Sequence, residues 1–149
     1  MFDATSPCEL TAASGEAEPR AGGAVRLSFV GEGERTRLAG LYQKTPLRAL
    51  FPRSRAEGLP VAVLANIGGG LVAGDRARVE VDVGPGAMAL VTSQAAEKVY
   101  RSTGLDTHVD AVLTVASGGW LEWCPQETIL FDGSRLRRRL TVDLVRDAR

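Results

Sequence analysis

Short runs of alternating apolar and polar residues, separated by glycine-rich turns, are the feature that most constrains this chain. The runs 25–29, 79–83, 109–115 and 136–144 all follow a two-residue period. Successive side chains of a strand point to opposite faces of a sheet, so this period predicts half-buried strands. The run 61–67 is short and almost continuously apolar, which is typical of a strand covered on both faces.

Evidence for helices is thin. The best window, residues 93–100, offers Ser93 as an N-cap and Glu97 in the first turn, but it spans only about two turns. Turn-forming residues separate the strand-like runs, for example at 84–86 and 117–119. We therefore expect an all-β chain of layered, stacked antiparallel sheets. The sheets would form a helical β-structure or a sandwich, with at most one or two short helices.

A weak internal repeat indicates how the strands are organised. Residues 79–94 align with residues 111–126 in the order strand, glycine turn, strand and polar corner, so that Gln94 corresponds to Gln126. This order predicts successive β-hairpins stacked as layers, each leaving a face for the next to cover. Residues 1–24 show no apolar period and are interpreted as a flexible leader, and residues 25–149 as one β-domain.

Composition excludes several function classes. The formal net charge is +0, whereas general binding of nucleic acid needs a basic excess. No apolar run reaches the ~18 residues that span a bilayer, and no signal peptide is recognised, so the sequence favours a cytoplasmic protein. The two cysteines, Cys8 and Cys124, form no disulfide framework, and Cys124 is expected to be a buried, inert thiol. The single histidine, His108, is expected in a polar loop rather than in a metal site.

A glycine-rich segment follows the apolar run 61–67. Gly68, Gly69, Gly70 and Gly74 precede Asp75 and match one form of the dinucleotide-binding fingerprint. That fingerprint requires a helix at the glycines, but residues 76–83 have the period of a strand. We therefore expect structural glycines in a tight bend, which Asp75 caps through backbone amides. A small nucleotide- or dinucleotide-binding enzyme that uses residues 68–75 remains the alternative.

Two polar segments contain the other candidate site residues. In 121–133, carboxylates lie among bulky apolar residues, and the structural interpretation is that Glu122 or Glu127 pairs with an arginine. In 90–102, no histidine base accompanies Ser93, so a hydrolase is disfavoured. The structural interpretation of this segment is a polar corner in which Thr92 and Gln94 hydrogen-bond the chain.

Taken together, these phrases resemble one family. They are Gln43–Arg48 (QKTPLR), Ile67–Asp75 (IGGGLVAGD), Thr92–Arg101 (TSQAAEKVYR) and Leu121–Gly133 (LEWCPQETILFDG). Their order and spacing resemble the urease accessory proteins called UreD, or UreH in some organisms. Chains of that family are longer, so the resemblance implies that residues 25–149 are the N-terminal portion of a longer domain.

The resemblance implies a non-catalytic maturation factor with an elongated β-structure. Such proteins bind UreF, recruit the GTPase UreG through UreF, dock on apo-urease and assist nickel delivery along a water-filled channel. It implies no tightly bound cofactor and at most transient nickel, which oxygen ligands bind reversibly. The implied relay or channel residues are Asp75, Glu122, Glu127 and Asp132. The implied polar corner and partner contacts are Thr92, Ser93, Gln94, Lys98, Tyr100, Arg101 and Gln126.

A third hypothesis is a purely structural β-domain of a larger assembly, without a metal path. Nickel binding by the partner complex would separate it from the relay, and binding of NAD or ATP would favour the nucleotide hypothesis. A truncated β-layer leaves an unpaired edge and an open apolar face. The sequence therefore also predicts poor solubility for this chain without partners.

Overall fold

The computed structural model describes residues 22–53 and 59–149, and all of the regular structure there is β. A five-stranded sheet contains β1 (Gly22–Glu32), β2 (Arg35–Lys44), β5 (Arg76–Val83), β8 (Thr107–Val115) and β11 (Leu136–Leu144). A four-stranded sheet contains β3 (Leu47–Leu50), β4 (Val61–Asn66), β6 (Met88–Ser93) and β9 (Trp120–Cys124). A small third sheet pairs β7 (Glu97–Val99) with β10 (Thr128–Leu130).

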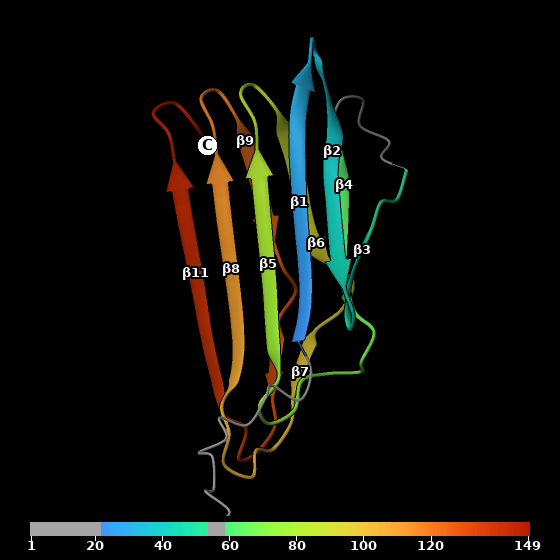
Figure 1. Cartoon of the computed structure of the whole chain (residues 1–149), viewed down its shortest axis with the longest axis vertical. Coiled ribbons are helices and arrows are strands. Elements are labelled where there is room, and N and C mark those ends of the chain that lie inside the picture. The colour runs from blue at the N-terminus through green and yellow to red at the C-terminus, as the bar shows by residue number, and fades with distance from the viewer. Residues whose placement is uncertain (1–21, 54–58) are drawn as a thin grey trace, which may run out of the picture.

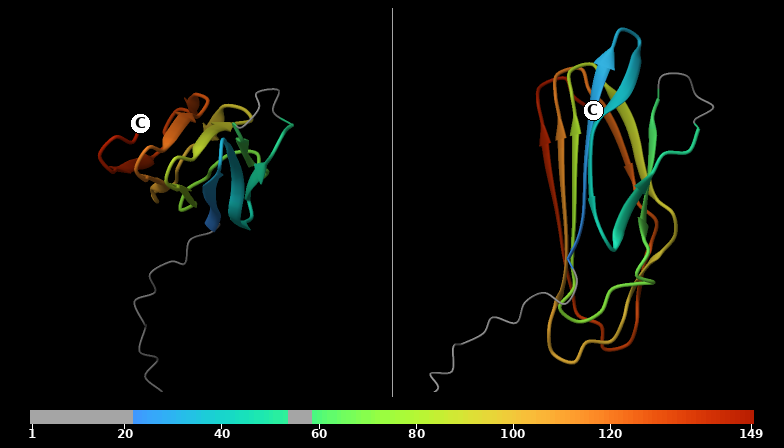
Figure 2. Two further views of the ribbon diagram at one scale, coloured as in Figure 1. Left: turned by 90° about the horizontal axis from the view of Figure 1, so that it is seen from above. Right: turned by 45° about the vertical axis from the view of Figure 1, so that its right-hand side comes forward.

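The chain winds through these sheets as a solenoid. One coil passes through β5, β6 and β7, and the next passes through β8, β9 and β10 before β11 begins a third. Figure 1 shows β1, β5, β8 and β11 side by side and running in the same direction. Figure 2 shows the two larger sheets as facing layers, joined by tight turns at one end and by longer connections at the other.

The pairing confirms the all-β prediction and corrects its detail. Strands of successive coils pair in parallel, and among the strand pairs only β1 with β2 and β3 with β4 are antiparallel. The expected hairpins are wrong, because the turn at 84–87 carries the chain from one sheet to the other. The helix expected at 93–100 is also absent, since β6 ends at Ser93 and β7 follows. Alternation alone does not distinguish a parallel neighbour from an antiparallel one.

The internal repeat of the sequence corresponds to one coil of the solenoid. Arg76 of β5 pairs with His108 of β8, and Met88 of β6 pairs with Trp120 of β9, an offset of 32 residues in both sheets. Stacking therefore follows the predicted repeat, although whole coils stack rather than hairpins. Of the predicted leader, residues 1–21 lie outside the described residues, and residues 22–24 belong to β1.

The core lies between the two larger sheets and extends to Leu71 and Val99 beside the small third sheet. Val25, Leu27 and Phe29 of β1 and Val81 of β5 are at most 1% exposed. They face the other layer, where the buried side chains are small, mostly alanine. Large side chains on one sheet and small ones on the other let the layers interdigitate closely. None of the described residues forms a helix long and apolar enough to cross a membrane.

Candidate functional site

A hollow among the described residues lies between the layers, near the small third sheet. It has a volume of about 500 Å³ and is bounded by all three sheets. Ala65, Ala77 and Ala111 line it, and these short side chains do not fill the space between the layers. Its polar lining consists of Asn66, Ser93, Gln94, Glu97, Lys98, Asp110, Gln126, Thr128, Arg138 and Arg139.

Glu97 is the central ionisable group of this cavity. Asn66 Nδ2 donates a hydrogen bond to Glu97 Oε1 at 3.1 Å. Burial raises the pKa of the Glu97 carboxyl above its ordinary value, and the Asn66 hydrogen bond and the charge of Arg138 oppose that rise. Arg138 donates to the hydroxyl of Thr128 at 2.7 Å. An acid, a base, an amide and a hydroxyl from four strands therefore meet in one partly enclosed space.

The predicted polar corner is confirmed in part. The Thr92 hydroxyl donates to the carbonyl of Cys124 at 2.7 Å, and the amide of Gln126 donates to Ser93 Oγ at 2.8 Å. These bonds join equivalent corners of successive coils. Gln94 holds the chain through its backbone amide, which donates to Leu64 at 2.8 Å, rather than through its side chain. Both Gln94 and Gln126 line the cavity.

Lys98, Tyr100 and Arg101 have separate positions. Lys98 lines the cavity, and its carbonyl accepts a hydrogen bond from Leu71 at 2.7 Å. The Tyr100 hydroxyl donates to the Gly69 carbonyl at 3.2 Å, and its ring lies 5.0 Å from that of Phe131 between ring centroids. Arg101 is exposed and pairs with a carboxylate of the next coil.

The glycine-rich segment forms the predicted bend. Gly69, Gly70 and Gly74 have positive φ values of 81°, 137° and 85°, which favour glycine. Gly68 donates its amide to Asn66 Oδ1 at 2.9 Å. The segment leads into β5 and not into a helix, so the nucleotide-binding alternative lacks the helix N-terminus that it requires.

Asp75 caps this bend, as the structural interpretation expects. The Val72 amide donates to Asp75 Oδ2 at 2.9 Å, and the Asp75 amide donates to the Val72 carbonyl at 3.1 Å. The residue is only 6% exposed, and its Oδ1 atom is buried without a hydrogen-bond partner among the described residues. Asp75 does not line the cavity that contains Glu97.

The other three predicted relay carboxylates lie apart from Asp75 and outside the cavity. Glu122 and Glu127 are exposed, and neither forms an ion pair within the described residues, so the expected arginine partner is absent there. Asp132 is 93% exposed and pairs with Arg101 at 2.5 Å. No group of three or more His, Cys, Asp or Glu side chains suited to a metal ion occurs in residues 22–53 and 59–149.

Two further expectations are wrong. Cys124 is exposed at the end of β9 and not buried, because its side chain lies on the outer face of that strand with Glu122. His108 lies in β8 and not in a loop, and its amide donates to the Asp75 carbonyl at 2.9 Å. A loop was expected at His108 because the neighbouring residues are polar. Pairing with β5 and β11 instead extends the strand through His108. Cys8 lies outside the described residues.

Sequence reasoning missed the residues at the centre of the cavity. Glu97 was assigned to a helix, and Asn66, Thr128 and Arg138 were given no role. The alternation of β11 contained a signal, because Arg138 shares the parity of the apolar residues Leu136 and Leu140. An arginine on the inward face of a strand needs a polar environment.

Comparison with known proteins identifies the family. A sequence model described as UreD urease accessory protein matches residues 21–149. A protein named urease accessory protein UreD from Magnetococcus marinus is 48% identical over 137 residues, covering 90% of this chain and 47% of that protein. Another protein of that name, from Rhodopseudomonas palustris strain HaA2, is 46% identical over 129 residues. That match covers 87% of this chain and 46% of the relative. The chain thus spans about half the length of these relatives. With a match over nearly all of its β-domain, the chain belongs to the UreD family of urease accessory proteins.

Proposed function

We propose that this chain acts in urease maturation as a non-catalytic scaffold in the cytoplasm. In this proposal it binds UreF, reaches UreG through UreF, and docks on apo-urease while nickel is delivered to the active site. The family match supports the role in maturation. The solenoid supports a scaffold, because its two long faces offer flat surfaces built from several strands.

The cavity is the observation that carries the nickel part of the proposal. Its lining offers carboxylate, amide and hydroxyl oxygens beside the cations Lys98, Arg138 and Arg139, with no described thiol or imidazole among them. Hard oxygen ligands hold a divalent ion less firmly than nitrogen and sulfur ligands do, which suits passage rather than storage. Nickel would be a transient cargo of this cavity and not a resident cofactor.

If nickel passes through the cavity, Glu97 is the residue on which that route depends most. Burial raises the pKa of its carboxyl, and a cation that enters the cavity would favour the ionised form. The four carboxylates predicted from sequence, Asp75, Glu122, Glu127 and Asp132, provide a second candidate route. Three of these carboxylates lie on the outside of the solenoid, whereas Asp75 is buried.

Reconstitution of urease activation tests the proposal and separates the two routes. We would express the urease subunits and accessory proteins with wild-type chain, Glu97→Gln, or Glu122→Gln combined with Glu127→Gln. Glu34→Gln, at an exposed position to which no role is assigned, serves as the control. Nickel content, urease activity and co-purification of UreF and apo-urease would be measured together.

The cavity route predicts that Glu97→Gln lowers nickel content and activity while the complex still forms. Loss of activity only in the variant with Glu122→Gln and Glu127→Gln would indicate that nickel passes along the exterior of the solenoid. Full activation by both variants, with an intact complex, would leave the chain a structural β-domain. Failure of the wild-type chain to co-purify with UreF and apo-urease would overturn the scaffold itself.

A further inference from the structure

Arginines gather on the outer face of the five-stranded sheet, at the end where β5, β8 and β11 begin. Pairing aligns Arg76 with His108 and His108 with Arg137, and one row further on aligns Arg78 with Asp110 and Asp110 with Arg139. These residues alternate with the inward-facing residues of β5, β8 and β11, which places them on the outer face of the sheet, although Asp110 and Arg139 also border the cavity. We call Arg76, Arg78, Arg135, Arg137 and Arg139 the arginine surface.

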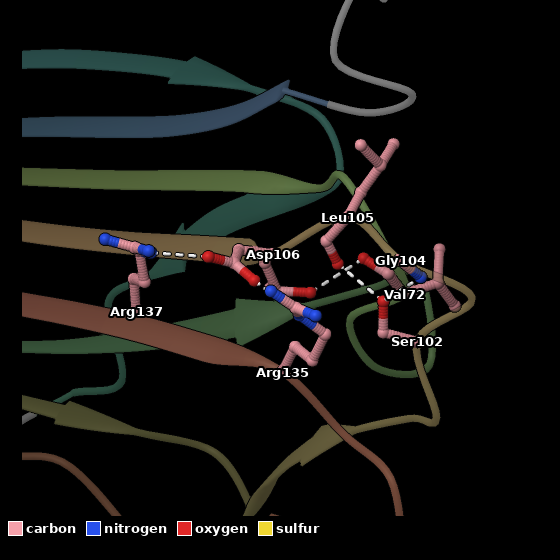
Figure 3. A network of polar contacts seen from close by, with 8 residues as sticks. Val72, Ser102, Gly104, Leu105, Asp106, Arg135 and Arg137 are labelled. Atoms are coloured by element: carbon pink, nitrogen blue, oxygen red, sulfur yellow. Dashed lines mark hydrogen bonds and ion pairs between the residues drawn. The ribbon is translucent and has the colours of Figure 1, made fainter.

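The five arginines of the arginine surface outnumber the three carboxylates beside them, Glu80, Asp106 and Asp110. Asp106 accepts from Arg135 at 2.7 Å and from Arg137 at 2.5 Å, and these two hydrogen bonds hold the pKa of its carboxyl below its ordinary value (Figure 3). Arg78 pairs with Glu80 at 2.5 Å. Neither Arg76 nor Arg139 has an ion-pair partner among the described residues.

The geometry of the surface suits recognition of carboxylates. Arg135 and Arg137 remain 55% and 71% exposed although Asp106 holds them. Anchored guanidinium groups lose less conformational freedom on binding than free ones, and each presents a fork of donors that matches a carboxylate. Neighbouring strands lie about 4.8 Å apart, so the arginines form a regular array on the surface of the sheet and not a pocket.

The opposite end of the same face has the opposite charge. Asp82 of β5 and Asp143 of β11 occupy the row that also contains Ser28 and Thr114. A face that changes sign along its length orients a partner as well as attracting it. Nucleic acid is a poorer fit, because the whole chain has a formal net charge of +0 and the arginine rows contain no aromatic side chain for stacking.

We propose that the arginine surface docks an acidic surface of a partner protein, through carboxylates that contact Arg76 and Arg139. The face lies on the outer side of the sheet, with Arg139 alone of these arginines also bordering the cavity, and the inference does not require nickel to pass through that cavity. It predicts binding that weakens as salt screens the charges.

Binding to a carboxylate polymer tests this docking surface. The full chain would be titrated with poly-L-glutamate and, separately, with single-stranded oligo-deoxythymidine, at low and at physiological salt. The test variant is Arg76→Gln with Arg139→Gln. The control is Arg35→Gln with Arg146→Gln, which removes equal charge from exposed positions at the other end of the solenoid. Equal melting temperatures would show that both variants are folded.

We expect the wild type to bind poly-L-glutamate and the test variant to bind it about fivefold to tenfold more weakly, with little change in the control. Equal weakening in both variants would mean that only net charge matters and would overturn the proposal. Tighter binding of oligo-deoxythymidine than of poly-L-glutamate would assign the surface to nucleic acid instead. No binding of poly-L-glutamate at low salt would also overturn it.

Discussion

At the scale of single residues, the glycines of the bend show what sequence can and cannot predict. The cluster at 68–70 predicts a bend that depends on glycine, and the positive φ values confirm it. The neighbour that makes one of these glycines irreplaceable comes from far along the chain. A Cβ atom at Gly70 would lie 2.6 Å from Tyr100 Cε2 and 2.9 Å from the Lys98 carbonyl oxygen, whereas at Gly69 nothing lies within 4 Å.

Gly70→Ala is therefore expected to destabilise the protein more than Gly69→Ala. Gly69→Ala adds the strain of a left-handed backbone, about 1–2 kcal/mol. Gly70→Ala adds strain and a clash with β7, which together cost about 3 kcal/mol or more. Urea denaturation of both variants measures the difference. Equal losses would mean that the Tyr100 side chain moves away freely.

Glu97 gives a prediction of pH dependence. Its pKa is raised in the folded state, so its contribution to stability is present below the ordinary glutamate pKa and is lost as pH rises through the raised value. Glu97→Gln does not titrate and keeps an oxygen that accepts from Asn66. The melting temperature of the variant relative to wild type should therefore be higher at pH 7 than at pH 4. A difference that does not change with pH would contradict the desolvation of this carboxyl.

At the scale of elements, the strands are predictable and their partners are not. The alternation of 79–83 and 109–115 locates β5 and β8, because burial of one face imposes that period. The direction of pairing depends on where the glycine turns send the chain, and sequence spacing does not determine this. The helix expected at 93–100 fails for a related reason, since β7 is defined by its pairing with β10 across 31 residues.

β1 is the element whose core side chains should matter most for stability. It lies between β2 and β5, and Phe29 is 1% exposed. Phe29→Ala removes buried surface and leaves a cavity, so we expect a loss of about 3–5 kcal/mol in the free energy of unfolding. Phe51→Ala, at a side chain 40% exposed, is the control and should cost much less. Chemical denaturation compares the two, and similar losses would place the main core elsewhere.

At the scale of the whole molecule, the repeat predicts stacking but not enclosure. An offset of 32 residues identifies one coil, yet the pattern does not reveal that three sheets surround a space. The apolar face of β11 shows a consequence of stacking. Leu140, Val142 and Leu144 are about half exposed, although they share the inward parity of the core strands. A strand with one unpaired edge and an open apolar face favours self-association.

We expect the 149-residue chain to self-associate through β11, and Val142→Lys to weaken this association about tenfold or more. Thr141→Lys adds the same charge to the outward face of the same strand and serves as the control. Sedimentation velocity over a range of protein concentrations measures both. A wild-type chain that remains a monodisperse monomer would contradict this prediction and the expected poor solubility.

The alanines around the cavity have a consequence for engineering. Because Ala65, Ala77 and Ala111 line the cavity, larger side chains at these positions would reduce its volume without changing the outer surface. Ala77→Leu would act as an internal plug. Urease activation by an Ala77→Leu protein that still binds its partners would separate the proposed passage of nickel through the cavity from recognition on the outer surface.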